Sequence, residues 1–149
     1  HEHLYFEAED GQYFASGSQL KDMQWSDWTC SYGWPVQGAW PRYDEVNDGS
    51  SGDPTAMHRS KDEKLLAVGD AVGNVKAFHW PCINKDAHDV RLNTHVGEVA
   101  KVRFTCDNKF VVSLGKKDRT IQIHKILPEK YNPTEGGALA PSEIKELAL

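Results

Sequence analysis

Short alternations of apolar and polar residues run through most of the chain, and clusters of glycine, aspartate, asparagine and lysine separate them. Alternation with a period of two is typical of strands that bury one face, and such clusters are typical of tight turns. No helical stripe precedes the last ten residues. The pattern therefore predicts an all-β fold. The predicted strands are residues 4–6, 12–17, 55–59, 65–68, 75–80, 89–94, 99–105, 110–113 and 120–127.

Three stretches depart from this alternation. Residues 23–28 place large side chains at intervals that fit an extended segment. Residues 32–53 are rich in Gly, Pro, Asp, Asn and Ser, which predicts a long loop. Residues 141–143, Pro-Ser-Glu, predict the start of a short amphipathic C-terminal helix, with a disordered end as the alternative.

The chain contains an internal repeat. Residues 59–66 align with residues 104–111, and residues 73–78 align with residues 119–124, an offset of about 45 residues. This offset is near the length of a WD-repeat propeller blade, about 40–45 residues. Each blade is a four-stranded sheet that buries its faces against its neighbours, and about three or more repeats are needed for a stable array. The sequence therefore predicts a partial WD-repeat β-propeller, about two to three blades of a larger ring.

The strand count divides the chain between blades. It begins inside a predicted strand with His1 rather than Met, so we expect a fragment of a longer protein. The remaining blades are then expected from the same or another chain. The predicted parts are outer strands of one blade (1–30), a long inter-blade loop (31–54), a complete blade (55–95), three strands of the next blade (96–127) and a C-terminal tail (128–149).

A hydrogen-bond network is predicted in the last unit. In a typical WD blade, a loop Asp, a loop His, a strand Ser or Thr and a strand Trp form a buried chain of hydrogen bonds. The last unit supplies Asp118, His95 and Ser113, whereas His124 stands where the Trp would be. The first three also resemble a Ser-His-Asp catalytic set, but no Gly-x-Ser-x-Gly or other nucleophile motif accompanies them. We therefore predict a structural network and no catalytic site.

The preceding unit differs because Val72 occupies the position of the loop Asp. We expect no comparable network there, so this unit has to rely on apolar packing. The expected packing residues are Leu65, Leu66, Val75 and Phe78.

Metal and cofactor motifs are missing from the sequence. The three cysteines, Cys30, Cys82 and Cys106, lack C-x-x-C spacing, and an odd number cannot pair fully. They predict free thiols in a reducing compartment, the cytosol, and no metal site. The glycine-rich residues 69–73 open no helix and do not match a phosphate loop, so we expect no nucleotide and no other cofactor.

Charge is unevenly distributed along the chain, whose net charge is −5. Residues 1–64 hold five basic and twelve acidic side chains, whereas residues 101–130 hold eight basic and three acidic ones. A concentrated basic surface attracts acidic partners, although a solvated strand edge protected from aggregation is the alternative. Most tryptophans lie in the acidic part, which argues against nucleic-acid binding. No apolar run is long enough for a membrane span, so no membrane partner is expected.

One string of residues is unusual in composition: residues 20–41 read LKDMQWSDWTCSYGWPVQGAWP. This string closely resembles a segment typical of the echinoderm microtubule-associated protein-like family, in which D-x-x-W, W-T-C and G-W/F-P-V-x-G-x-W-P motifs precede a blade similar to residues 55–80. The later strings KLLA and GNVKAFHWPC also resemble that family. The resemblance covers residues 4 to about 127.

The resemblance implies a function. Members of this family carry two fused propellers that bind tubulin or microtubules, and several act in mitotic spindles or cilia. The chain is thus expected to hold C-terminal blades of a non-enzymatic, tubulin-binding cytoskeletal protein. The implied location is the cytoplasm, on microtubules of a spindle or of a cilium axoneme. The alternative is a generic WD-repeat scaffold for protein–protein interaction.

A partner-binding face is predicted from blade geometry. The connection between blades and the connection between the second and third strands emerge on the same rim of a WD blade. The long loop and the basic turn of Lys116, Lys117 and Arg119 are therefore expected to share one face. Trp34 and Trp40, each followed by proline, are the candidate contacts from the loop, with loop packing as the alternative.

Overall fold

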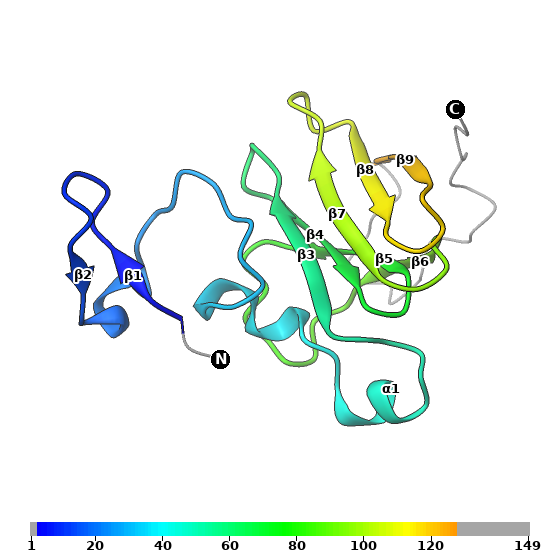
Figure 1. Ribbon diagram of the computed structural model, residues 1–149, viewed down its shortest axis with the longest axis horizontal. Coiled ribbons are helices and arrows are strands. Elements are labelled where there is room, and N and C mark those ends of the chain that lie inside the picture. Colours follow the sequence, from blue (N-terminus) through cyan, green and yellow to red (C-terminus); the bar gives the residue numbers. More distant parts are fainter. Residues whose placement is uncertain (1–2, 128–149) are drawn as a thin grey trace.

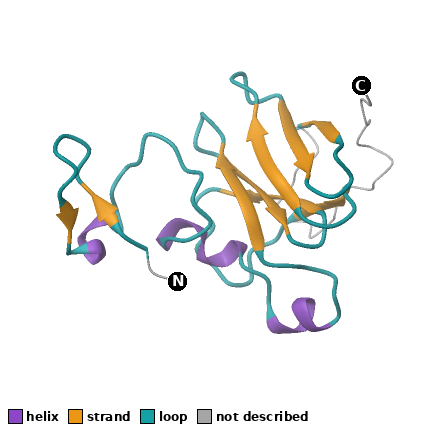
Figure 2. Ribbon diagram, viewed as in Figure 1, coloured by secondary structure: helices purple, strands orange, loops and turns teal. Residues whose placement is uncertain are grey.

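The computed structural model describes residues 3–127, whose strands form three separate antiparallel sheets (Figure 1). The predicted tail, residues 128–149, lies outside the described residues. Most of the described chain is strand and loop, with short helices before the four-stranded sheet (Figure 2). The all-β prediction is confirmed. The sheets contain β1 (Tyr5–Phe6) and β2 (Tyr13–Phe14); then β3 (Pro54–Arg59), β4 (Leu65–Asp70), β5 (Asn74–His79) and β6 (Val90–Asn93); then β7 (Val99–Phe104), β8 (Phe110–Gly115) and β9 (Ile121–Lys125).

Every strand predicted from residue 55 onward is present, with bounds within two residues of the prediction. The repeat also holds in the turns, because Glu63 and Asn108 have φ angles of 57° and 56° in the β3–β4 and β7–β8 turns. In each turn a hydroxyl accepts a backbone N–H: Ser60 Oγ from Leu65 at 2.9 Å, and Thr105 Oγ1 from Phe110 at 3.1 Å. The four-stranded and the three-stranded sheet therefore close their first turns in the same way, by a hydroxyl that accepts a backbone N–H five residues later.

The four-stranded sheet buries one face against β7. Val99 and Val102 of β7 lie in one apolar cluster with Ala67 and Val75 of the four-stranded sheet. A Cβ at Gly69 would lie 2.5 Å from a Val99 methyl carbon, so the close approach of β7 requires glycine at that position. The two sheets thus stack face to face, as neighbouring blades do.

The opposite face of the four-stranded sheet is covered by the segment that precedes it. Trp28 and Val36 pack there against Met57, Leu66 and Val68. Residues 23–28 form no strand; instead the Arg59 guanidinium donates to the carbonyls of Trp25 and Ser26 at 2.8 and 3.0 Å. A buried side chain therefore satisfies backbone groups that a strand partner would satisfy in a sheet.

The segment predicted as a long loop contains two helices, η2 (Trp34–Ala39) and α1 (Tyr43–Asn47), and the short η1 (Gly17–Leu20) precedes them. Pro35 stands in the first turn of η2, where its missing N–H costs no hydrogen bond. Long-range bonds then fix η2: Gly38 N–H donates to Cys82 O, and Cys82 N–H donates to Pro35 O, both at 2.8 Å. Elements this short give no hydrophobic period, so composition alone favoured a loop.

Candidate functional site

The three-stranded sheet of β7, β8 and β9, which is the second of the two stacked sheets, carries a hydrogen-bond network centred on His95. This side chain is buried, with Nδ1 3.1 Å from Asp118 Oδ2 and Nε2 2.8 Å from Ser113 Oγ. The structure thus brings together the three residues predicted to form a network. His124 lies on β9, opposite Val111, and is buried as well.

Asp118 also organises the β8–β9 turn. Its carboxylate accepts backbone N–H groups from Val96 at 2.9 Å and Thr120 at 3.1 Å. These bonds, together with the hydrogen bond to His95, lower the pKa of Asp118 to about 2. The carboxylate is therefore ionised at neutral pH and links the β6–β7 loop to the β8–β9 turn.

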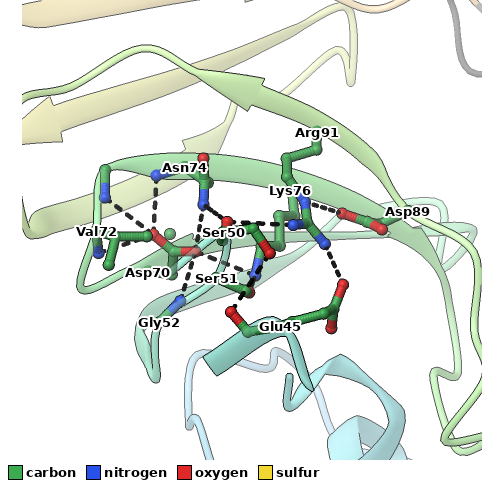
Figure 3. A network of polar contacts seen from close by, with 12 residues as sticks. Glu45, Ser50, Ser51, Gly52, Asp70, Val72, Asn74, Lys76, Asp89 and Arg91 are labelled. Carbon is green, nitrogen blue, oxygen red and sulfur yellow. Dashed lines mark hydrogen bonds and ion pairs between the residues drawn. The ribbon is translucent and has the colours of Figure 1, made fainter. Parts of the chain in front are cut away.

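The four-stranded sheet, which is the first of the two stacked sheets, has a buried polar network of its own (Figure 3). The expectation that this unit relies on apolar packing alone is therefore wrong. Asp70, at the end of β4, is fully buried. Burial by itself would raise its pKa, but hydrogen bonds from Asn74 and the ion pair with Lys76 hold the pKa below its ordinary value. Both carboxylate oxygens of Asp70 are fully used as acceptors. Oδ1 accepts backbone N–H groups from Val72, Gly73 and Asn74 at 3.0, 2.9 and 2.8 Å. Oδ2 accepts from Gly52 N–H, Asn74 Nδ2 and Lys76 Nζ at 3.2, 2.8 and 3.1 Å.

The two sheets supply a carboxylate to equivalent places from different positions in the chain. Gly115 pairs with Val99 in the second sheet as Asp70 pairs with Pro54 in the first. A Cβ at Gly115 would lie 1.9 Å from Asp118 Oδ1. The Asp118 carboxylate thus fills the space beside Gly115 that, in the first sheet, belongs to the side chain of Asp70. Sequence reasoning missed Asp70 because it searched for an acid only at the aligned turn position.

A signal for Asp70 was nevertheless present in the sequence. The stretch Asp70-Ala71-Val72-Gly73-Asn74 places an aspartate just before a tight turn. Aspartate side chains commonly accept N–H groups of the residues that follow them in such turns. Gly73 has a φ of 106°, which favours glycine and directs the next N–H groups toward the carboxylate.

Lys76 and Arg91 extend this network to the preceding segment (Figure 3). Lys76 is buried and contacts both Asp70 and Ser51 Oγ. Arg91 on β6 donates to Glu45 Oε1 of α1 at 2.7 Å and to Asp89 Oδ2 at 3.1 Å. Burial raises the pKa of Glu45, but its bonds to Arg91 and Arg42 outweigh burial and lower it. The network therefore fastens α1 and residues 50–52 to the sheet.

A polar cavity of about 360 Å³ lies beside this network. Arg42 and Glu45 line it from the α1 side, and Lys76, Asp89 and Arg91 line it from the sheet side. Arg91 is ion-paired with both Glu45 and Asp89, and Lys76 is ion-paired with Asp70. The arrangement is thus one of structural ion pairs.

The three predicted cations lie on the β8–β9 turn. Lys116, Lys117 and Arg119 are exposed, and Lys116 Nζ lies 2.8 Å from Glu98 Oε2. Arg119 has a φ of 57°, the same conformational region that glycine occupies in the equivalent turn of the first sheet.

The two predicted tryptophans belong to a different place. Trp34 is 40% exposed, with Lys21 Nζ 5.9 Å from its ring centroid. Trp40 Nε1 donates to Ser31 O at 2.9 Å, and its ring lies against Tyr32. These contacts make Trp40 part of the packing of its own segment.

The structure does not bring the tryptophans and the cations together. The η2 helix, which begins at Trp34, is bonded to Cys82, beyond the end of β5. The cation turn contacts His95, whose backbone N–H donates to Gly73 O at the start of β5. Trp34 and the cations therefore lie toward opposite ends of β5, because the segment 32–53 runs along the sheet.

Several site types have no support in the described part of the chain. Within residues 3–127, no group of three or more His, Cys, Asp or Glu side chains is arranged to hold a metal ion. Cys30, Cys82 and Cys106 are free thiols, and burial raises the pKa of Cys82 to about 11. Over the same residues, no helix combines the length and the apolar character needed to span a bilayer.

Comparison of the sequence with known proteins identifies relatives of this chain. Residues 1–126 match the family model described as the echinoderm microtubule-associated protein second beta-propeller. The chain is 34% identical over 131 residues to echinoderm microtubule-associated protein-like 3 of Mus musculus, covering 83% of the chain and 14% of the relative. It is 32% identical over 127 residues to the like-1 protein of Rattus norvegicus (85% and 15%). It is 34% identical over 145 residues to the like-4 protein of Homo sapiens (97% and 14%). The chain thus spans about one seventh of the length of these relatives.

Proposed function

The chain belongs to the echinoderm microtubule-associated protein family as part of its second β-propeller, and from this premise we propose that it is a segment of a tubulin- or microtubule-binding WD-repeat propeller. The family match over residues 1–126 carries this proposal, and the two stacked antiparallel sheets are consistent with it. In this proposal the chain acts as a non-enzymatic binding module. Its setting is the cytoplasmic cytoskeleton, on microtubules of a spindle or of a cilium.

The basic β8–β9 turn is the proposed contact with tubulin. Lys116, Lys117 and Arg119 are exposed on a short, well-defined turn, so their charge is concentrated. A concentrated positive field attracts an acidic protein surface and speeds association. Trp34 is proposed as a separate contact at the other end of β5, and Trp40 as an anchor of its own segment.

The hydrogen bonds of His95 with Ser113 and Asp118 are proposed to hold the second sheet together and to shape this turn. Asp118 joins the β6–β7 loop to the turn that carries the cations. Loss of the carboxylate would therefore change the positions of the cations as well as the stability of the sheet.

The remaining blades are proposed to cover the outer face of the second sheet. Four aliphatic side chains of β8 and β9 form two cross-strand pairs on this face, Val112 with Ile123 and Leu114 with Ile121. Val112 and Ile123 are half-buried, whereas Leu114 and Ile121 are exposed, Ile121 to 55%. Within residues 3–127, β9 pairs with β8 alone. A further blade, from the same or another chain, would bury these side chains.

Co-sedimentation with polymerised tubulin tests the proposed function. The full-length protein is expected to pellet with microtubules in a saturable way and to remain in solution without them. If it stays in solution at tubulin concentrations that pellet a known microtubule-binding control, the microtubule proposal is wrong. A generic WD-repeat scaffold then becomes the better account.

A further inference from the structure

Two exposed valines lie beside the place where the β6–β7 loop is hydrogen-bonded to the β4–β5 turn, which we call the joint between the stacked sheets. Val72 is 40% exposed in the β4–β5 turn, and Val96 is 65% exposed in the β6–β7 loop. The loop and the turn are bonded together, because Gly73 O accepts the backbone N–H groups of Thr94 at 3.3 Å and His95 at 3.1 Å. Each valine is the neighbour of a residue in this bonded pair, so the two valines flank the same joint.

The basic turn continues this surface. Val96 N–H donates to Asp118, and a Cβ at Gly97 would lie 3.6 Å from Lys117 Cδ. Lys116 N–H donates to Glu98 O at 2.9 Å. The β6–β7 loop and the β8–β9 turn are therefore in contact, with exposed Val96 on the loop and exposed Lys117 on the turn.

The charges of this surface are not balanced. Glu98 is ion-paired with Lys116, and the Asp118 carboxylate is occupied by His95 and two backbone N–H groups. For Lys117 and Arg119, the residues that the structure describes provide no carboxylate partner within 4.0 Å. Asp53, whose carbonyl accepts Ala71 N–H at 3.0 Å, lies beside the β4–β5 turn of the four-stranded sheet. The surface is thus basic at the second sheet and apolar at the joint.

We propose that Val72, Val96, Lys117 and Arg119 form one docking surface across the joint, and that its occupant is an acidic peptide segment that carries an aliphatic residue among its carboxylates. Lys117 and Arg119 bind the carboxylates, and the aliphatic side chain is buried between the valines. Burying an aliphatic group beside charge contacts gives selectivity that charge alone lacks. The inference rests on the proposed function and deepens it by naming the part of the partner that is recognised.

The surface is formed only when both sheets are in place. Val72 belongs to the first sheet's turn, whereas Lys117 and Arg119 belong to the second sheet's turn. The hydrogen bonds of Gly73 with the β6–β7 loop fix the spacing between these parts. A variant that loosens the joint should therefore weaken docking without removing any of the four contact residues.

A peptide titration of the full-length protein tests the inference by fluorescence anisotropy. The probes are labelled peptides Glu-Glu-Leu-Glu-Glu, Glu-Glu-Ser-Glu-Glu and Lys-Lys-Leu-Lys-Lys. We expect saturable binding of the leucine peptide, about tenfold weaker binding of the serine peptide and no binding of the basic peptide. Val72→Ser with Val96→Ser should weaken the leucine peptide about tenfold and leave the serine peptide unchanged. Lys117→Glu with Arg119→Glu should weaken both acidic peptides at least tenfold.

Matched controls lie at the other end of the sheets. Ile83→Ser removes an exposed aliphatic side chain after β5, and Lys109→Glu reverses an exposed charge in the β7–β8 turn. Equal losses in these controls, or no saturable binding of the leucine peptide, would overturn the inference. Thermal melts of each variant identify any loss that comes from unfolding. Peptide binding without microtubule pelleting refutes the proposed function alone, and pelleting that is insensitive to the valine variants refutes the docking surface alone.

Discussion

The backbone N–H of Phe104 donates a hydrogen bond of 2.9 Å to Nδ1 of His58, and this contact joins β7 to β3 across the two stacked sheets. An acceptor nitrogen carries no proton, so the contact requires the neutral imidazole. Nε2 of the same ring lies 3.6 Å from Asp27 Oδ1 in the segment before the first of these sheets. One histidine therefore holds three parts of the chain together.

Stability should depend on pH through His58. Burial lowers the pKa of His58, nearby Arg103 and Arg59 lower it further, and Asp27 opposes them. The pKa of His58 in the folded state lies below the unfolded value of about 6.5. The stability that neutral His58 contributes is therefore fully present above that pH. This stability is lost as the pH falls from about 6.5 toward the folded pKa. Urea unfolding of the full-length protein at pH 7.5 and 5.5 should show the loss.

His58→Asn is the informative variant, because an amide oxygen can accept the Phe104 N–H without titrating. The loss of stability between pH 7.5 and 5.5 should be smaller in this variant than in the wild type. His88→Asn, at an exposed position, is the control and should retain the wild-type dependence. Equal pH dependence in the wild type and His58→Asn would contradict the assignment.

Gly115→Ala should destabilise the second stacked sheet. The new Cβ would lie 1.9 Å from Asp118 Oδ1 and 2.5 Å from His95 Nδ1, so the carboxylate has to move. Overpacking of this kind costs about 1–3 kcal/mol. A double-mutant cycle with Asp118→Ala, measured by chemical unfolding, should show that alanine at position 115 costs less once the carboxylate is gone. Additive effects would refute the proposed competition for space.

Asp70→Asn and Lys76→Met should have unequal costs. Asn at position 70 leaves the Lys76 ammonium buried beside a neutral amide, and an uncompensated buried charge costs about 3–5 kcal/mol. Met at position 76 leaves the Asp70 carboxylate with the N–H groups of Val72, Gly73 and Asn74. The free energy of unfolding should therefore fall less for Lys76→Met than for Asp70→Asn. The reverse order would show that the turn N–H groups do not stabilise the carboxylate.

Charge reversal at Lys116, Lys117 and Arg119 together should weaken microtubule pelleting of the full-length protein about tenfold and flatten its dependence on salt. Reversal of Lys64, Lys61 and Lys109 changes the same charge at the other end of the strands and serves as the control. Pelleting is compared at two salt concentrations. Wild-type pelleting and salt dependence in the first triple variant would remove the basic turn from the tubulin contact.

Leu114→Ser and Ile121→Ser test whether a further blade covers the second sheet. If these side chains are buried in the full-length protein, each substitution should cost about 1–2 kcal/mol. A truly exposed side chain would cost less than about 0.5 kcal/mol, as expected for the Ile83→Ser control. Unfolding curves of the three variants separate these outcomes.

The sequence by itself determined the features that depend on residues close together in the chain, namely the strands and the tight turns. Strand positions follow from alternation, and the paired turns at Glu63 and Asn108 follow from residues repeated about 45 positions apart. The pattern of a typical WD blade, which this repeat indicated, was sufficient to select His95, Ser113 and Asp118, because each has a defined place within one blade. The resemblance of residues 20–41 also pointed to the family that the comparison shows.

Only the tertiary structure decided features that depend on residues far apart in the chain. The helices of residues 32–53 are held by bonds such as Gly38 to Cys82 and Arg91 to Glu45, which no local period reveals. The separation of Trp34 from the basic turn arises because that segment runs along the length of the sheet. The Asp70 network appeared only in space, since a carboxylate can reach the same place from a strand end or from a turn, and position in an alignment does not distinguish the two.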